Sequence, residues 1–172
     1  TQVPEQFASE SHYCAEFIAK FQHLTDDLEA AKKQGLLSLR IIHGDPKLNN
    51  FLFDQHSNRI VSIIDLDTVK PGLVHYDIGD CLRSCCNRQG ESARESRVGF
   101  DLEVCRPLLG AYADRTQGLL VPAEVTLLFA AIRLIPFELG LRFLTDHLQG
   151  NPWFRVSAPG QNLAKARIQF AL

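Results

Sequence analysis

The sequence predicts a mostly α-helical domain with a small β-hairpin element, an α+β fold. Apolar residues recur at three- and four-residue steps over long stretches toward both ends of the chain, as on amphipathic helices. Near the middle, two short apolar runs flank a polar turn, as in a β-hairpin. The 172 residues contain no repeats, low-complexity tracts or linker, so we expect one folded unit.

Each element has a local signal. In chain order, we expect a helix over residues 4–33, a strand over 36–42, hairpin strands over 51–53 and 60–64, a helix from about 77, and helices over 101–115, 122–148 and 162–170. Gly35 stops the first helix, and Asp101 caps the helix that it precedes. Pro107 bends that helix or ends its first part, whereas Pro122 suits the first turn of the long helix. The polar segment 89–97 is expected to be an exposed loop.

Composition excludes several classes of protein. Hydrophobic residues make up 45% of the chain and charged residues 22%, which is typical of a globular protein. The net charge of −2, without a dense basic patch, argues against nucleic acid as a partner. No run of about 18 apolar residues is present, which argues against a membrane partner, and no signal peptide is visible. The irregularly spaced cysteines also indicate a reducing setting, so we expect a cytoplasmic protein.

The five cysteines do not look like a disulfide framework, because their number is odd and their spacing irregular. An alternative is a metal site formed by Cys81, Cys85 and Cys86 with the nearby His75. The paired short spacings typical of zinc sites are absent, so we expect these thiols to pack as small apolar side chains.

The stretch HGDPKLNN, residues 43–50, has the pattern of a phosphotransfer site. Its polar residues directly follow an apolar strand, where polar groups without partners are costly. The spacing of His43, Asp45 and Asn50 matches a kinase catalytic loop. In such a loop the Asp accepts the proton of the acceptor hydroxyl and the Asn holds a metal ion.

A second acidic motif, IIDLD, follows the hairpin. Asp65 lies 20 residues after Asp45, at the end of an apolar strand. Carboxylate oxygens are the ligands that a hard cation bridging phosphates prefers. We expect the hairpin to return the chain so that Asp65 faces Asn50, which would bring base, amide and carboxylate to one Mg-phosphate site. The alternative is that these are turn and cap residues.

These motifs resemble the aminoglycoside phosphotransferase and choline kinase family, relatives of protein kinases that phosphorylate hydroxyl groups of small molecules. The likeness lies in HGDPKLNNFLFD, IIDLD and YDIGD. It implies the C-terminal lobe of a protein-kinase-like fold, with ATP as phosphate donor and Mg²⁺ as cofactor. By this resemblance Asp45 is the catalytic base, and Asn50 and Asp65 are the metal ligands.

The same resemblance gives roles to the neighbouring residues. His43 is a structural member of the loop, and Asp77 braces the loop from the start of the next helix. Lys47 occupies the position where many protein kinases carry a lysine that neutralises the transferred phosphate; the alternative is a solvated side chain. The roles of Asp67 and Asp80 stay open, and Asp80, like His75, is expected to be structural.

The finer likeness is to sugar kinases of the N-acetylhexosamine 1-kinase type. It rests on the HxDxKxNN run and on FELGLRFLTDHLQGNPWF followed by QNLAKARIQF. It implies a sugar or amino sugar as acceptor, while aminoglycoside, choline and homoserine-type acceptors remain alternatives. An alternative that is not an enzyme is a kinase-like module for binding or regulation.

Residues 1–172 cover only one lobe of the family's fold. No G-x-G-x-x-G occurs, so the Gly-rich loop of the N-terminal nucleotide lobe is absent from the chain. The chain also has no Met and begins at Thr1, so we expect it to be part of a longer protein. Alone it would be a poor or inactive kinase.

The acceptor-facing residues are expected near the C-terminus, where charged side chains interrupt an apolar helix. The candidates are Arg133, Glu138, Arg142 and Trp153. Glu138 and Arg142 lie one helical turn apart, so the alternative for them is a mutual ion pair. Trp153 either stacks on a sugar ring or closes the core.

Overall fold

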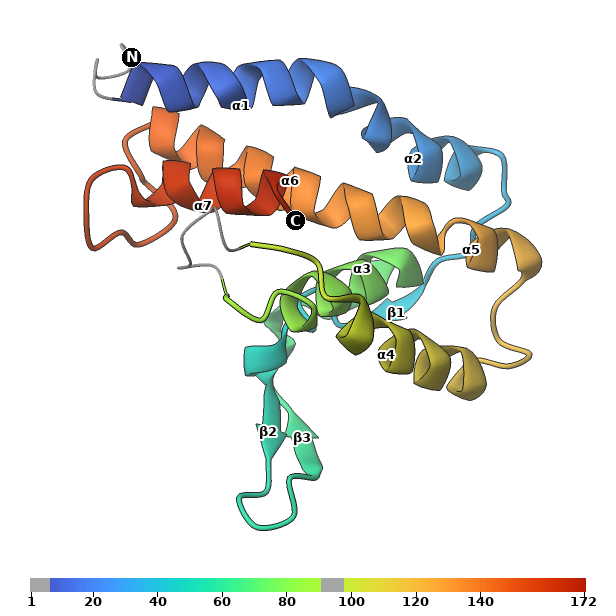
Figure 1. The fold of residues 1–172 in the computed structure, drawn as a ribbon. Helices are drawn as coiled ribbons and strands as arrows, with labels where there is room; N and C mark the ends of the chain where they lie inside the picture. The colour runs from blue at the N-terminus through green and yellow to red at the C-terminus, as the bar shows by residue number, and fades with distance from the viewer. Residues whose placement is uncertain (1–6, 91–97) are drawn as a thin grey trace.

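The computed structural model describes residues 7–90 and 98–172, which are mostly helical with two small antiparallel sheets (Figure 1). The helices are α1 (Ala8–Phe21), α2 (Asp26–Lys33), α3 (Val74–Cys85), α4 (Leu102–Arg115), α5 (Pro122–Thr126), α6 (Leu128–Leu148) and α7 (Gln161–Phe170). The strands are β1 (Arg40–Ile42), β2 (Phe51–Phe53), β3 (Ile60–Ile63) and β4 (Lys70–Gly72). Short 3-10 helices are η2 (Gln22–Thr25), η3 (Leu48–Asn50) and η4 (Leu66–Thr68). The predicted fold class, mostly α with a small β-hairpin, is confirmed.

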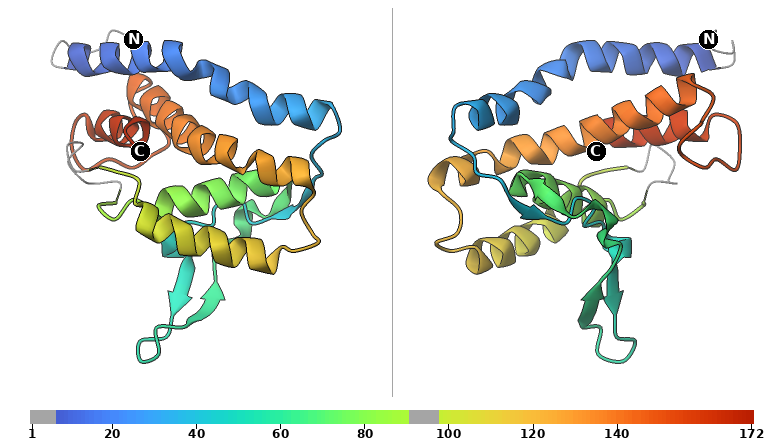
Figure 2. Two further views of the ribbon diagram at one scale, coloured as in Figure 1. Left: turned by 45° about the vertical axis from the view of Figure 1, so that its right-hand side comes forward. Right: turned by 180° about the vertical axis from the view of Figure 1, so that it is seen from behind.

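Helix α6 is the centre of the molecule. It packs against α7 on one side and α3 on another, and α1 and α2 lie across it and α7 (Figures 1 and 2). The main apolar core fills the space among these helices and includes Leu28, Leu134, Phe137 and Leu163. A smaller cluster, with Leu82 and the buried thiols of two cysteines, joins α3 to α4. No helix in the described part of the chain is long and apolar enough to cross a membrane.

Two predicted helices are interrupted. The helix expected over 4–33 is divided by η2, because Asp26 and Asp27 favour a new helix start, and its residues 4–6 lie outside the described residues. The helix expected over 122–148 is divided at Leu127, where ψ is 1°. There the preceding short helix α5 is fixed by its buried Glu124, which binds Arg40. The predicted loop 89–97 lies mostly outside the described residues.

The hairpin agrees with expectation, whereas the first predicted strand differs in its length and its pairing partner. The hairpin β2–β3 is where the sequence predicts it, and it projects away from the helices (Figure 2). The first strand is shorter than predicted and pairs with β4, with Ile41 opposite Pro71, a pairing that no sequence signal indicated. This second ribbon brings the segment after the hairpin back beside the loop 43–50. Helix α3 also begins earlier than predicted, at Val74.

Candidate active site

The loop 43–50 is held by helix α3. Asp77, in the first turn of α3, accepts hydrogen bonds from two consecutive backbone N–H groups, at 2.8 Å from His43 N and 2.9 Å from Gly44 N. Hydrogen bonds to an ionised acceptor are roughly twice as strong as neutral ones. Gly44 has φ +85°, and a Cβ there would lie 2.7 Å from Thr68 O, so this turn requires glycine. The start of the loop is therefore held in one backbone conformation.

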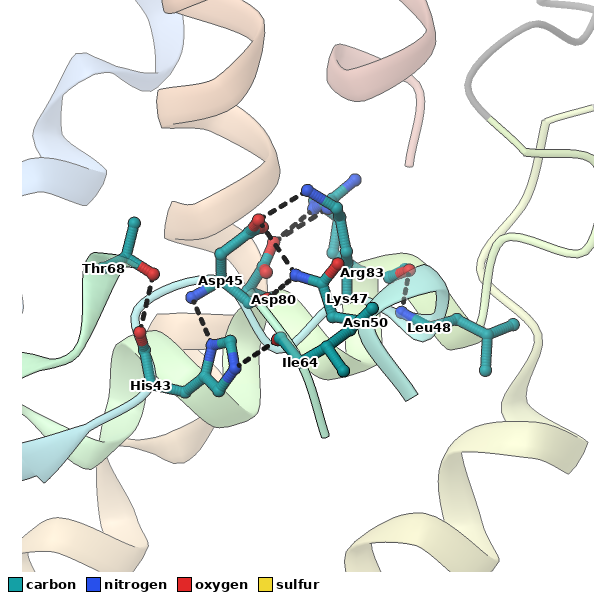
Figure 3. Close-up of polar contacts among 10 residues, drawn as sticks. His43, Asp45, Lys47, Leu48, Asn50, Ile64, Thr68, Asp80 and Arg83 are labelled. Atoms are coloured by element: carbon teal, nitrogen blue, oxygen red, sulfur yellow. Dashed lines mark hydrogen bonds and ion pairs between the residues drawn. The ribbon is translucent and has the colours of Figure 1, made fainter. Parts of the chain in front are cut away.

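His43 connects the loop to the end of β3 (Figure 3). Its Nε2 lies 3.1 Å from Ile64 O, and since a carbonyl oxygen only accepts, the ring proton is on Nε2. Nδ1 is then free to accept from Asp45 N, at 3.3 Å. Ile64 N in turn donates to Asn50 O at 2.9 Å. Both ends of the loop are thus tied to the residue that precedes Asp65.

Asp45, Lys47 and Asn50 form one cluster (Figure 3). Lys47 Nζ lies 2.5 Å from Asp45 Oδ2, and Asn50 Nδ2 lies 3.2 Å from the same oxygen and 2.7 Å from Asp45 O. Asn50 is buried, whereas the Asp45 side chain is 28% exposed. Among the described residues nothing donates to Asp45 Oδ1, so this oxygen is available to a ligand while Oδ2 is fixed.

Asp65 stands at the start of η4 in a left-handed conformation, with φ 65°. Asp tolerates this region better than most residues. The hydrogen bonds of Ile64 hold the backbone that precedes Asp65 next to Asn50 and His43. Asp65 itself is exposed. Asp67, inside η4, is exposed as well. The role of Asp65 as a metal ligand stays a prediction.

The donor set fits a magnesium–nucleotide complex. Asn50 and Asp65 offer an amide and a carboxylate oxygen, and Mg²⁺ in nucleotide sites is bound by one or two such groups together with phosphates and water. A complete protein cage is not required for this chemistry. In the described ranges, no group of three or more His, Cys, Asp or Glu is placed to hold a metal ion, and this includes the cysteines of α3.

The loop borders a cavity of about 990 Å³ whose other walls come from α3, α6, α7 and the segment before α7. The charged residues in its lining are Asp45, Lys47, Lys70, Asp80, Arg83, Arg88, Glu138, Arg142 and Lys165. A cavity of this size has room for a small acceptor next to transferable phosphate.

On the α3 side of the cavity lies a buried ion pair. Both Nε and Nη2 of Arg83 lie 2.8 Å from Asp80 Oδ1, and the Arg83 side chain is only 4% exposed. Burial raises the pKa of Asp80, while the neighbouring Arg83 opposes the rise. Asp80 Oδ2 is buried and has no hydrogen-bond partner among the described residues. His75, by contrast, lies outside the cavity lining, fully buried, with Nε2 2.8 Å from Glu124 O.

Two of the four predicted acceptor-facing residues line the cavity of the loop, and the other two lie elsewhere. Glu138 and Arg142 line the cavity that contains Asp45. Arg133 lines a second, apolar cavity of about 490 Å³, and Trp153 is 81% exposed. Nine residues along an α-helix correspond to about 2.5 turns, so Arg133 and Arg142 lie on opposite faces of α6.

Glu138 and Arg142 do not form an ion pair with each other in the described structure. Desolvation inside the cavity raises the pKa of Glu138, and Arg142 opposes this rise. The Glu138 side chain still keeps part of its surface in contact with solvent.

Sequence reasoning did not single out several cavity residues. Arg83 follows Asp80 by three positions on a helix, a spacing that indicates an ion pair. Ser84, whose Oγ accepts from Leu48 N at 2.9 Å, also ties α3 to the loop. Phe154 and Lys165 carry no local signal, because only the packing of α7 on α6 brings them to the cavity.

Comparison with known families agrees with this site. A model of the phosphotransferase enzyme family (APH) matches residues 2–114, which are 113 of the 172 residues. The match includes the loop 43–50, Asp65 and Asp77, whereas α6 and α7 lie outside it. The predicted kinship with aminoglycoside phosphotransferases and choline kinases is confirmed at this level, and the chain belongs to the phosphotransferase enzyme family.

Proposed function

We propose that this chain is the catalytic and acceptor-binding lobe of an ATP- and Mg²⁺-dependent phosphotransferase that acts on a hydroxyl group of a sugar or amino sugar. The observation that carries the proposal is the cluster at the cavity: Asn50 and Lys47 both hold Oδ2 of Asp45, and Oδ1 is left for the acceptor. Asp77 and His43 hold the backbone of the same loop.

In the proposed reaction, Asp45 orients the acceptor hydroxyl and takes its proton. The bond from the acceptor oxygen to the γ-phosphorus forms while the bond from that phosphorus to the β,γ-bridging oxygen breaks, and ADP leaves. Lys47 stabilises the negative charge on the transferred group. Asn50 and Asp65 would hold Mg²⁺, which when bound neutralises phosphate charge. Positioning and electrostatic stabilisation supply most of the rate enhancement.

A non-catalytic binding module is less well supported. Such a module would need the shape of the cavity but not an acid, a lysine and a buried amide joined by hydrogen bonds at 2.5–3.2 Å. Aminoglycoside, choline and homoserine-type kinases share the catalytic loop, so the choice of acceptor depends on the rest of the cavity.

The hairpin supports the proposal that a nucleotide-binding lobe completes the enzyme. Its strands expose Leu52 (44%), Phe53 (47%) and Val61 (65%), and Ile41 on the neighbouring ribbon is 73% exposed. Several large apolar side chains exposed on one projecting element commonly mark an interface. We propose that the nucleotide lobe covers this surface, and that residues 1–172 alone are inactive.

The test is ADP release by the full-length protein with ATP and Mg²⁺ across sugars, amino sugars, aminoglycosides and amino alcohols. Turnover should stop when EDTA removes the metal. An Asp45→Asn variant should lose about 10²- to 10⁴-fold in kcat, because it cannot accept the proton. Asp54→Asn is a matched control, since Asp54 only caps the turn of the hairpin. A folded Asp45→Asn protein with undiminished kcat would refute the proposal.

A further inference from the structure

We propose that the natural acceptor carries an acidic group, a carboxylate or a phosphate, and that Arg142 and Lys165 bind this group in the cavity. The proposal rests on the proposed phosphotransferase function and narrows its acceptor class. It concerns one wall of the cavity, the α6–α7 wall, formed by Arg142, Phe143, Phe154 and Lys165.

The lining of the cavity contains more positively than negatively charged side chains. Its lining contains six lysine and arginine side chains and three carboxylates. Three of the cations are compensated locally: Lys47 by Asp45, Arg83 by Asp80, and Arg88 by Asp101 outside the lining. The remaining cations, Lys70, Arg142 and Lys165, take part in none of the ion pairs of the described residues. The cavity therefore attracts an anion.

The two cations of the α6–α7 wall are held by aromatic rings. The guanidinium of Arg142 lies over the Phe154 ring, 5.4 Å from its centroid, and Lys165 Nζ lies 5.2 Å from the centroid of Phe143. The two rings contact each other at a centroid distance of 4.7 Å. A cation–π contact fixes the position of a cation without using its N–H donors. Both side chains thus keep donors for an oxygen-rich ligand.

A single buried carboxylate organises the α6–α7 wall. Asp146, which is 1% exposed, accepts from Phe154 N at 3.1 Å and from Trp153 N at 2.8 Å. Its Oδ2 also accepts from Asn162 Nδ2 at 2.7 Å. One buried carboxylate on α6 therefore fixes both the segment that carries Phe154 and the helix that carries Lys165. A preorganised site of this kind gives more binding free energy than side chains that must first be ordered.

Glu138, the carboxylate of α6 that lines the cavity, does not make the α6–α7 wall negative. Glu138 lies one turn from Arg142. Its one negative charge is outnumbered by the cations Lys70, Arg142 and Lys165 of the same lining. A cationic acceptor such as an aminoglycoside or choline would meet Arg142 and Lys165 as well as Glu138, and repulsion from the two like charges disfavours its binding. A sugar acid or a sugar phosphate would find two free cations.

The experiment compares acceptors that differ mainly in charge, using the full-length protein. Glucose is the neutral member, glucosamine the cationic one, glucuronate carries a carboxylate and glucose 6-phosphate a phosphate. We expect one of the two acids to have the highest kcat/KM, and the pair distinguishes carboxylate from phosphate recognition. Arg142→Gln and Lys165→Gln should each raise the KM for that acid by about ten- to a hundredfold. Arg106→Gln, whose side chain is 75% exposed on α4, controls for net charge.

The outcomes separate the two proposals. Highest kcat/KM with glucose or glucosamine would overturn the acidic-acceptor proposal and leave the phosphotransferase function intact. If Arg142→Gln and Lys165→Gln raise the KM for ATP and not the KM for the acid, the acidic-acceptor proposal is also overturned, because the two cations would then bind nucleotide phosphates. Absence of ADP release with every acceptor, by a folded protein, would overturn the phosphotransferase function itself. Thermal unfolding of each variant shows whether a loss reflects misfolding.

Discussion

Asp77 is the residue whose replacement tests how the catalytic loop is held. Its two carboxylate oxygens accept from His43 N and Gly44 N at 2.8 and 2.9 Å. In Asp77→Asn, only one oxygen remains as an acceptor, and the new NH₂ group faces a backbone N–H. One charge-assisted hydrogen bond is lost and the other becomes neutral.

These changes give the expected magnitude. A hydrogen bond to a charged group contributes about 1.5–3 kcal/mol and a neutral one about 0.5–1.5 kcal/mol. Losing the first and weakening the second lowers the free energy of unfolding by about 2–4 kcal/mol, with the lower end favoured because Asp77 is half-buried. Because Asp45 is two residues from His43, we also expect kcat to fall by about tenfold to a hundredfold from misplacement of the base.

The assay is urea unfolding of Asp77→Asn, followed by steady-state kinetics under conditions where the variant is fully folded. Asp114→Asn is the matched control, because Asp114 is exposed on α4 and does not contact the loop. If Asp77→Asn unfolded at the same urea concentration as the control and kept its kcat, the hydrogen bonds from the loop to Asp77 would contribute neither to stability nor to catalysis.

Two further predictions concern packing and buried charge. Glu124→Gln should lower the free energy of unfolding by about 1.5–3 kcal/mol at pH 7, because fully buried Glu124 pairs with Arg40, which is 32% exposed. The Arg40 hydrogen bond lowers the Glu124 pKa, so this stabilisation is present above the usual pKa of 4.5, and in urea unfolding the difference from wild type should shrink below about pH 4. Gly140→Ala should destabilise by about 1–3 kcal/mol in thermal unfolding, since a Cβ there would lie 2.4 Å from Phe170. Gly110→Ala, with open space around it, should be neutral or slightly stabilising, and the same loss at both glycines would contradict the packing argument.

Elements with local causes were predictable from the sequence. The strands of the hairpin and the start of α4 follow from an apolar run, a polar turn and a cap, and Asp101 accepts from Glu103 N and Val104 N as a capping residue should. The catalytic loop is local in the same sense. Asp45 and Asn50 are only five residues apart, so a tight loop can bring the amide to the carboxylate.

Features that depend on distant residues were not predictable. The break between α5 and α6 involves Glu124, whose partner Arg40 is 84 residues away. The strand β4 contains Pro71 and Gly72, which disfavour strands, and it forms only because β1 provides a pairing partner. The separation of Arg133 from Arg142 differs from these cases, because nine residues on an α-helix are about 2.5 turns and the spacing itself predicts that the two side chains lie on opposite faces of α6.

The loop and the α6–α7 wall are held by different carboxylates, Asp77 and Asp146, which share no hydrogen-bond partner within residues 7–90 and 98–172. Asp146→Asn should therefore raise the KM for the acceptor and leave kcat at saturation unchanged, whereas Asp77→Asn lowers kcat. In the double variant, the two losses in kcat/KM should multiply, because independent sites add in free energy to within about 0.5 kcal/mol. The measurement is a double-mutant cycle on kcat/KM. A coupling well above that value would show that acceptor binding and base positioning depend on one shared structure rather than on two separate supports.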